Sequence, residues 1–164
     1  MTDAATSDAA TDAAWLQQAV ELAVANVGAG GGPFGALVVK GGELIASGHN
    51  RVTRDLDPTA HAEVMAIRAA CARLGDFALT GCTLYASCEP CPLCVSASLW
   101  ARVDRVVYAA DRDDAARGGF DDRMFYDLLA RDRATWPMPV TEVAVDESFA
   151  PFAAWLDQAG RTPY

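Results

Sequence analysis

The chain has 164 residues, which is enough for one domain with a substantial core. Its 22 acidic and 13 basic residues give a formal net charge of −9, and Lys40 is the only lysine. Proteins that bind a phosphate backbone normally carry a positive surface, so this charge argues against a nucleic-acid partner and for a small-molecule substrate. Since no apolar run reaches transmembrane length and the first residues lack a basic n-region, we expect neither a membrane segment nor a secretory signal.

The first elements in chain order are a tail, a helix and a hairpin. Residues 1–13 are rich in Ala, Thr and Asp and are expected to be disordered. A helix over 14–27 follows and ends at the Gly-rich stretch 28–33. That stretch follows a helix and precedes a strand, the reverse of a dinucleotide fingerprint, so a flexible connection is favoured over a phosphate loop. Strands are expected at 35–40 and 43–49, joined by the two-residue turn Gly41-Gly42.

The rest of the chain alternates helices with strands. A helix over 60–74 opens after Asp57-Pro58-Thr59 and closes at Gly75. The later expected elements are a strand at 83–87, a helix at 91–101, a strand at 103–109, a polar connection at 111–119, a helix within 120–131, a strand at 140–145 and a helix at 151–159. This order predicts one three-layer α/β/α domain over 14–164, whose five-stranded mixed sheet has helices on both faces. Right-handed crossovers would make the last three strands parallel and start the helices at 60 and 91 on one side of the sheet.

Two short motifs stand at the starts of those two helices. They are His61-Ala62-Glu63 and Pro90-Cys91-Pro92-Leu93-Cys94, the H-x-E and P-C-x-x-C pattern of zinc deaminases that act on nucleobases. One imidazole and two thiolates leave the fourth tetrahedral position of Zn²⁺ to water, as catalytic zinc sites require. The positive end of a helix dipole lowers the pKa of a thiol and favours its ligating form. Glu63 is left off the metal and is free to carry protons.

Other uses of the same residues stay open. A Cys-x-x-Cys pair also occurs in redox motifs and structural zinc knuckles, and Cys88 could supply a fourth ligand to a Cys₃His site. Against a structural role, His61 and Glu63 lean toward the buried stripe of their helix, where unpaired polar groups are costly. Five cysteines are an odd number without a disulfide framework, so we expect free thiols, a reducing compartment and a cytoplasmic protein.

With these residues the chain resembles the cytidine-deaminase superfamily and, within it, looks like the bacterial guanine deaminases. The resemblance covers about residues 15 to 164. The stretches that carry it are 32–36, Asn50, 57–63, 87–94, 100–102, 119–122, 148–152 and the terminal Tyr164. The zinc motifs are shared by the whole superfamily, whereas Gly119-Phe120-Asp121-Asp122 and Tyr164 are more discriminating.

The resemblance implies zinc-dependent hydrolysis of guanine to xanthine and ammonia, a step of purine catabolism. It implies one Zn²⁺ per subunit, held by His61, Cys91, Cys94 and a water, with Glu63 as the proton shuttle. It also implies further site residues: Asn50 to hydrogen-bond the purine, Phe34 to pack on its ring, Trp100 and Tyr164 to enclose the pocket, and Asp122 to recognise the base or assist proton transfer. The partner it implies is a second copy of the chain, in a homodimer that exchanges its C-terminal segments.

Alternatives to this function also remain. Guanosine, an aminotriazine or adenosine in tRNA would need only a different pocket, although the charge disfavours tRNA. A non-catalytic, zinc-stabilised binding module would need a fourth protein ligand such as Cys88. Glu89 and Glu147 are lesser candidates for an acid. Judged without the resemblance, the five proposed pocket residues would be ordinary packing, turn, capping and terminal residues.

Overall fold

The structure is a computed structural model that describes residues 3–163, with side chains from residue 9 onward. The chain divides into two compact units, and the boundary lies between Phe125 and Tyr126. The N-terminal unit holds the sheet and the two zinc-deaminase motifs. The C-terminal unit holds most of α6 (Arg123–Leu129), the short helix η1 (Arg133–Thr135) and α7 (Ala150–Asp157).

The N-terminal unit is built on a mixed sheet with the strand order β2-β1-β3-β4. The strands are β1 (Gly35–Lys40), β2 (Glu43–His49), β3 (Cys82–Cys88) and β4 (Arg105–Ala110). β1 is antiparallel to β2 and to β3, whereas β3 and β4 are parallel. The hairpin and the two strands after it therefore follow the prediction closely, because alternating apolar residues and the Gly41-Gly42 turn are local signals.

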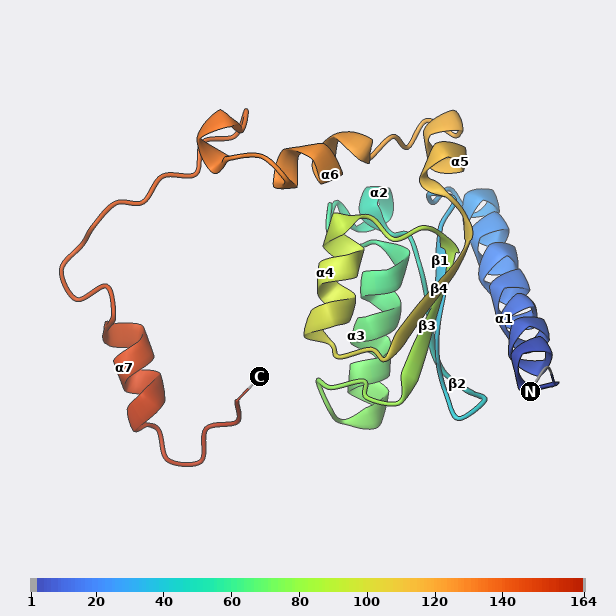
Figure 1. The fold of residues 1–164 in the computed structure, drawn as a ribbon, viewed down its shortest axis with the longest axis horizontal. Helices are drawn as coiled ribbons and strands as arrows, with labels where there is room; N and C mark the ends of the chain where they lie inside the picture. The colour runs from blue at the N-terminus through green and yellow to red at the C-terminus, as the bar shows by residue number, and fades with distance from the viewer. Residues whose placement is uncertain (1–2, 164) are drawn as a thin grey trace. The chain divides into compact units, whose positions relative to one another are not determined.

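Helices cover both faces of this sheet (Figure 1). α1 (Asp3–Gly28) lies on one face, and α3 (Ala62–Leu74) and α4 (Pro92–Trp100) lie on the other. The alternation along β1 divides the core accordingly: Ala36 and Val38 pack toward α3, and Leu37 and Val39 pack with Ala19 of α1. The predicted mixed sheet with helices on both faces is thus present in this unit.

Close contact between β2 and α3 determines how near to the sheet the His61-Ala62-Glu63 motif lies. A Cβ built on Gly48 would lie 2.3 Å from the carbonyl oxygen of Ala62 and 2.4 Å from the amide nitrogen of Ala66. Both alanines are fully buried in the core. Because neither partner has a bulky side chain at the contact, the first turn of α3 rests directly on the strand.

One predicted strand is absent from the structure, and the first helix begins earlier than predicted. The predicted fifth strand at 140–145 is wrong: Val143 and Val145 are 75% and 64% exposed, and the sheet has four strands. The valines suggested a strand face, but a strand needs a partner strand for its backbone N–H and C=O groups, and residues 126–163 contain no strand. α1 begins at Asp3 rather than at 14, since its Ala-rich first half is a good helix former.

Two short helices of the N-terminal unit were not predicted. α5 (Arg112–Arg117) replaces the expected polar connection, and its N-cap is Asp111, whose carboxylate accepts hydrogen bonds from the backbone N–H groups of Asp113 and Asp114. α2 (Val52–Asp55) follows β2. Both helices are short, so their sequences carry little periodicity to detect.

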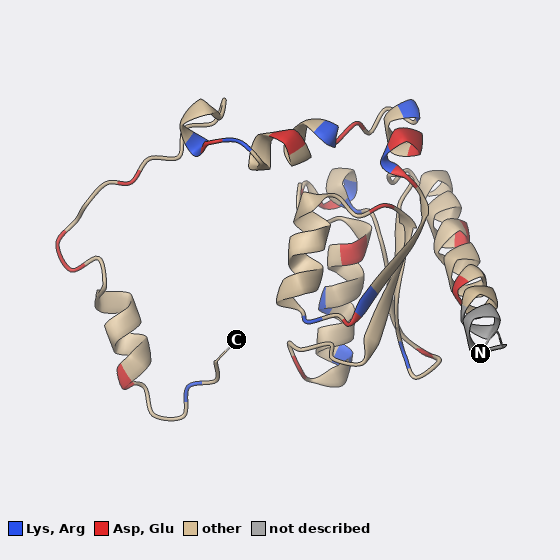
Figure 2. Ribbon diagram, in the orientation of Figure 1, with Lys and Arg blue, Asp and Glu red and all other residues tan. Residues whose placement is uncertain are grey.

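Charged residues are interspersed along the described chain (Figure 2). Red and blue segments alternate from α5 into the C-terminal unit, whereas α4 is free of both colours. Within residues 3–163, no helix is long and apolar enough to cross a membrane.

Candidate metal centre and substrate pocket

Three side chains that can bind a metal converge where α3 and α4 begin. His61 is the N-cap residue of α3 and Cys91 is the N-cap residue of α4, and Cys94 lies in the first turn of α4. Pro92 begins α4 at a position where its missing N–H costs no helical hydrogen bond. Because both helices lie on one face of the sheet with their first turns at the same end, residues 30 positions apart become neighbours.

The geometry of this triangle fits a tetrahedral zinc ion. His61 Nδ1 lies 3.5 Å from Cys91 Sγ and 3.4 Å from Cys94 Sγ, and the two sulfurs are 3.6 Å apart. Tetrahedral coordination with ordinary Zn–N and Zn–S bonds requires about 3.6 Å between N and S and about 3.8 Å between the sulfurs. The three ligands therefore need almost no movement to share one ion.

Cys88 is not part of this triangle. The metal-binding group found among residues 3–163 consists of His61, Cys91 and Cys94. The Cys88 thiol instead points to the carbonyl oxygen of Asp111, 3.7 Å away, and burial raises its pKa to about 11. A Cys₃His structural site therefore has no support, and the fourth coordination position is left to water.

The two thiols of the triangle titrate as a pair. The hydrogen bond with Cys94 and the nearby His61 lower the pKa of Cys91 to about 4, whereas the pKa of Cys94 is raised because it shares the proton and is fully buried. The hydrogen bond with Cys91 likewise raises the pKa of His61. One thiolate is thus already favoured at neutral pH, and a bound cation would displace the remaining proton.

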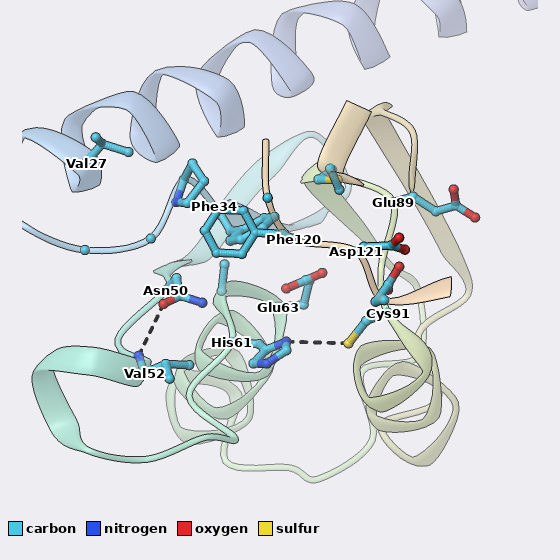
Figure 3. Close-up of a pocket in the computed structure, with 18 of the residues that line it drawn as sticks. Val27, Phe34, Asn50, Val52, His61, Glu63, Glu89, Cys91, Phe120 and Asp121 are labelled. Atoms are coloured by element: carbon cyan, nitrogen blue, oxygen red, sulfur yellow. Dashed lines mark hydrogen bonds between the residues drawn. The ribbon is translucent and has the colours of Figure 1, made fainter. Parts of the chain in front are cut away.

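Glu63 stands beside this triangle as a buried carboxyl group. It is 7% exposed, and desolvation by burial is the main reason that its pKa is raised. In Figure 3 its carboxylate points into the space that the His61 ring and the Cys91 sulfur also face. A raised pKa makes it easier for a carboxyl group both to accept and to donate a proton, as an acid/base catalyst must.

These groups open into a cavity of about 770 Å³. Phe34 lines it from the loop before β1 and meets Phe120 edge to face, with ring centroids 5.0 Å apart and planes at 87°. Asn50 lines it from the end of β2, and its Oδ1 accepts a hydrogen bond from the backbone N–H of Val52 at 3.2 Å. Figure 3 shows the two rings across the cavity from His61. The cavity thus offers an apolar surface for a flat ring and a carboxamide for its polar edge.

Two neighbouring aspartates at the cavity differ in their partners. Asp121 is ion-paired with Arg123, and this hydrogen bond lowers its pKa to about 2. Asp122 has a buried Oδ1 for which the described residues supply no hydrogen-bond partner, and burial raises its pKa. Asp122 therefore has a buried oxygen whose hydrogen-bonding capacity is open to a ligand, whereas Asp121 is already engaged by Arg123.

The structure does not bring every expected residue to the cavity. Trp100 ends α4 with 67% of its surface exposed and lies outside the cavity lining, next to Leu99. Tyr164 falls outside the described residues. Glu147 is exposed in the C-terminal unit, where its φ is +60°.

Some cavity residues were missed by the sequence reading. Phe120 belongs to a quoted motif, but its pairing with Phe34 joins residues 86 positions apart in the sequence and has no local signal. Glu89, considered as an acid, forms an ion pair with Arg112 at the start of α5, and both line the cavity. The hydrogen bond from Arg112 lowers the pKa of Glu89, and the ion pair links the segment after β3 to the start of α5.

Comparison with known proteins gives a consistent result. Residues 9–110 match the family described as the cytidine and deoxycytidylate deaminase zinc-binding region. Guanine deaminase of Bacillus subtilis is 49% identical over 151 residues, which are 92% of this chain and 97% of that protein. Its crystal structure superposes with a TM-score of 0.89 over the same shares of the two chains. A guanine deaminase structure from Nitrosomonas europaea is 40% identical with a TM-score of 0.64, covering 66% of this chain and 64% of that one. A tRNA-specific adenosine deaminase of Aquifex aeolicus is 47% identical but covers 48% of this chain.

Proposed function

This chain belongs to the cytidine and deoxycytidylate deaminase family, and we propose that it hydrolyses guanine to xanthine and ammonia. The observation that carries the proposal is the buried Glu63 carboxyl group beside a zinc-fitting triangle, inside a cavity that can hold a flat ring. Similarity to a guanine deaminase along almost the whole chain supports guanine as the substrate.

His61, Cys91 and Cys94 would hold the zinc ion. When bound, Zn²⁺ lowers the pKa of a water molecule toward ~7 and so supplies a nucleophile at neutral pH. A matched pair of variants tests the assignment: Cys91→Ala should lose zinc and activity together, whereas Cys71→Ala, which removes a thiol outside the triangle, should keep both. Full zinc content in purified Cys91→Ala, measured by elemental analysis, would contradict the ligand assignment.

Glu63 would move the protons of the reaction. It accepts a proton from the attacking water and donates it to N3 of the purine, which makes C2 more electrophilic. After C2 has gained the hydroxyl group, the same carboxylate takes the hydroxyl proton and passes it to the exocyclic amine. The C2–N bond then breaks, ammonia leaves and xanthine remains. The burial that raises the pKa of Glu63 favours the protonated form that the second transfer needs.

Four side chains would orient the base. Phe34 and Phe120 would pack against the ring, Asn50 would hydrogen-bond its edge, and Asp122 would offer its unpartnered Oδ1 to an N–H of the base or to the leaving amine. Guanine presents N–H groups on its amidine-like edge, which suits a carboxylate acceptor.

Ammonia release from guanine, guanosine, adenine, cytidine and an aminotriazine tests the substrate assignment. We expect guanine to have the highest kcat/KM. A preference for guanosine of tenfold or more would make the nucleoside the substrate, and activity confined to a tRNA anticodon stem would replace the proposal with tRNA editing. Zinc-bound protein that releases no ammonia from any of these would favour a binding module.

We also propose a homodimer with exchanged C-terminal segments, within one deaminase domain over 14–164. The uncharged α4 exposes Val95, Leu99 and Trp100, and α7 exposes Phe152 and Leu156, so both helices carry apolar surface that a second copy could cover. In such a dimer Trp100 and Tyr164 would close a cavity. The five free thiols fit a cytoplasmic location.

Subunit complementation distinguishes exchange from a tail that serves its own chain. Glu63→Gln and Tyr164→Ala are each expected to be inactive alone, and they are then unfolded and refolded together. If tails are exchanged, each mixed dimer contains one intact site, and activity should return to about a quarter of wild type. If each tail completes its own site, the mixture should stay inactive although mixed dimers form.

A further inference from the structure

Asn26 is a buried polar residue that the proposed chemistry leaves without a role. It lies near the end of α1 and is 7% exposed. Its side-chain Nδ2 donates two hydrogen bonds to backbone carbonyls outside the helix, to Gly32 O at 2.8 Å and to Asn50 O at 2.9 Å. We propose that Asn26 is a positioning residue, which holds the base-binding wall of the cavity in place and so acts on purine recognition rather than on hydrolysis.

Asn26 closes a ring of hydrogen bonds that contains two of the four proposed base contacts, Phe34 and Asn50. Gly32 O also accepts a hydrogen bond from Phe34 N at 2.9 Å, and Asn50 N donates to Phe34 O at 3.1 Å. The ring therefore runs from Asn26 to Gly32, Phe34 and Asn50 and back to Asn26. Figure 3 shows Phe34 and Asn50 together on the side of the cavity where Val27, near the end of α1, also lies.

The loop from α1 to β1 is shaped around this side chain. Gly31 N donates to the backbone oxygen of Asn26 at 2.8 Å, and a Cβ on Gly31 would lie 2.4 Å from Asn26 Nδ2. A Cβ on Gly32 would come within 3.0 Å of the Asn50 side chain. The glycines thus permit close approach to two asparagines, and the stretch that the sequence suggested to be a flexible connection is held by hydrogen bonds.

The chemistry of the contact requires an amide nitrogen at this position. Backbone carbonyl oxygens can only accept, so the NH₂ group of Asn26 must face Gly32 and Asn50. Aspartate has nearly the same shape but, when ionised, only accepts. Asn26→Asp therefore replaces two hydrogen bonds with the repulsion of three oxygens while changing little volume.

The zinc triangle and Glu63 lie outside this ring. The backbone N–H of His61 bonds to Thr59 O, and Glu63 and Cys91 stand on α3 and at the start of α4. Loss of Asn26 should therefore misplace Asn50 and Phe34 while the metal and the proton shuttle stay in place. Misplacement of about 1 Å can cost up to ~10²-fold, and here that cost should fall on substrate binding.

The test rests on the proposed function and begins with wild-type kinetics on guanine. For Asn26→Asp we expect KM to rise about 10- to 100-fold, with kcat within about threefold and the zinc content unchanged. Gln18→Glu is the matched control, because it makes the same chemical change at an exposed position of the same helix. Gly31→Ala is a second variant, which should raise KM similarly by pushing the Asn26 amide without adding charge.

A double-mutant cycle separates positioning from general stability. Asn50→Ala removes one of the two base contacts that Asn26 positions, so adding Asn26→Asp to it should lower kcat/KM at least about threefold less than Asn26→Asp does in the wild-type background. The role of Asn26 would be overturned if the losses of kcat/KM in the two single variants multiplied in the double variant. It would also be overturned if Asn26→Asp lowered kcat at constant KM, or lost zinc while still folded. Wild-type constants in Asn26→Asp and Gly31→Ala would overturn it as well. A wild-type enzyme that releases no ammonia from guanine would instead refute the proposed function.

Discussion

Gly48→Ala tests how far catalysis depends on the contact between β2 and α3. The added Cβ would lie 2.3 Å from the carbonyl oxygen of Ala62, whereas real Cβ contacts are rarely closer than 3.4 Å. The obstacle is helix backbone, which cannot rotate away as a side chain can. The first turn of α3, which follows His61 and carries Glu63, must therefore move by about 1 Å.

The magnitude follows from two separate effects. Overpacking of a tight core contact costs about 1–3 kcal/mol of the free energy of unfolding, and each kcal/mol lowers the Tm of a domain of this size by roughly 2–4 °C. A displacement of about 1 Å between proton shuttle and substrate can cost up to ~10²-fold in kcat. We therefore expect Gly48→Ala to be folded at 25 °C but to have a lower kcat.

Calorimetry and steady-state ammonia release measure the two effects. Gly28→Ala is the control, because a Cβ at Gly28 would meet nothing within 4 Å. The control should keep wild-type Tm and kcat. If Gly48→Ala had the same Tm and kcat as Gly28→Ala, the contact between β2 and α3 would not determine the position of the first turn of α3.

Three further predictions concern carboxyl groups. Glu63→Gln should keep its zinc and lose about 10²- to 10⁴-fold in kcat, and near-wild-type turnover would remove Glu63 from proton transfer. Asp122→Asn should lower kcat/KM on guanine, whereas Asp121→Asn, which breaks an exposed ion pair, should leave it within about twofold; equal losses would contradict the distinction. The hydrogen bond from Arg105 lowers the pKa of Asp12 in the folded state. The stability that ionised Asp12 contributes is therefore present above the pKa of ~4 that an aspartate has in the unfolded chain, and it is lost as the pH falls through the lower pKa of the folded state. In urea denaturation Asp12→Asn should be less stable than wild type by about 1 kcal/mol at pH 7, with the difference shrinking toward pH 3.

The sequence by itself predicted the features that depend on neighbours along the chain. The bounds of β1 and β2 follow from a two-residue alternation and a Gly-Gly turn, the start of α4 follows from Pro92, and the end of α3 follows from Gly75. The zinc triangle could also be predicted, because all three ligands lie at or within the first turn of a helix and right-handed crossovers place helix starts on one side of a sheet.

The tertiary structure decided which neighbours become functional. Asp121 and Asp122 have the same side chain, and only the fold gives one an arginine partner and leaves the other with a buried oxygen for which the described residues supply no partner. The Phe34–Phe120 contact and the ring of hydrogen bonds through Asn26 join residues that are distant in the chain, so no local sequence pattern predicts them. The strand expected at 140–145 is absent for the same reason, since a strand exists only where a second one supplies its hydrogen bonds.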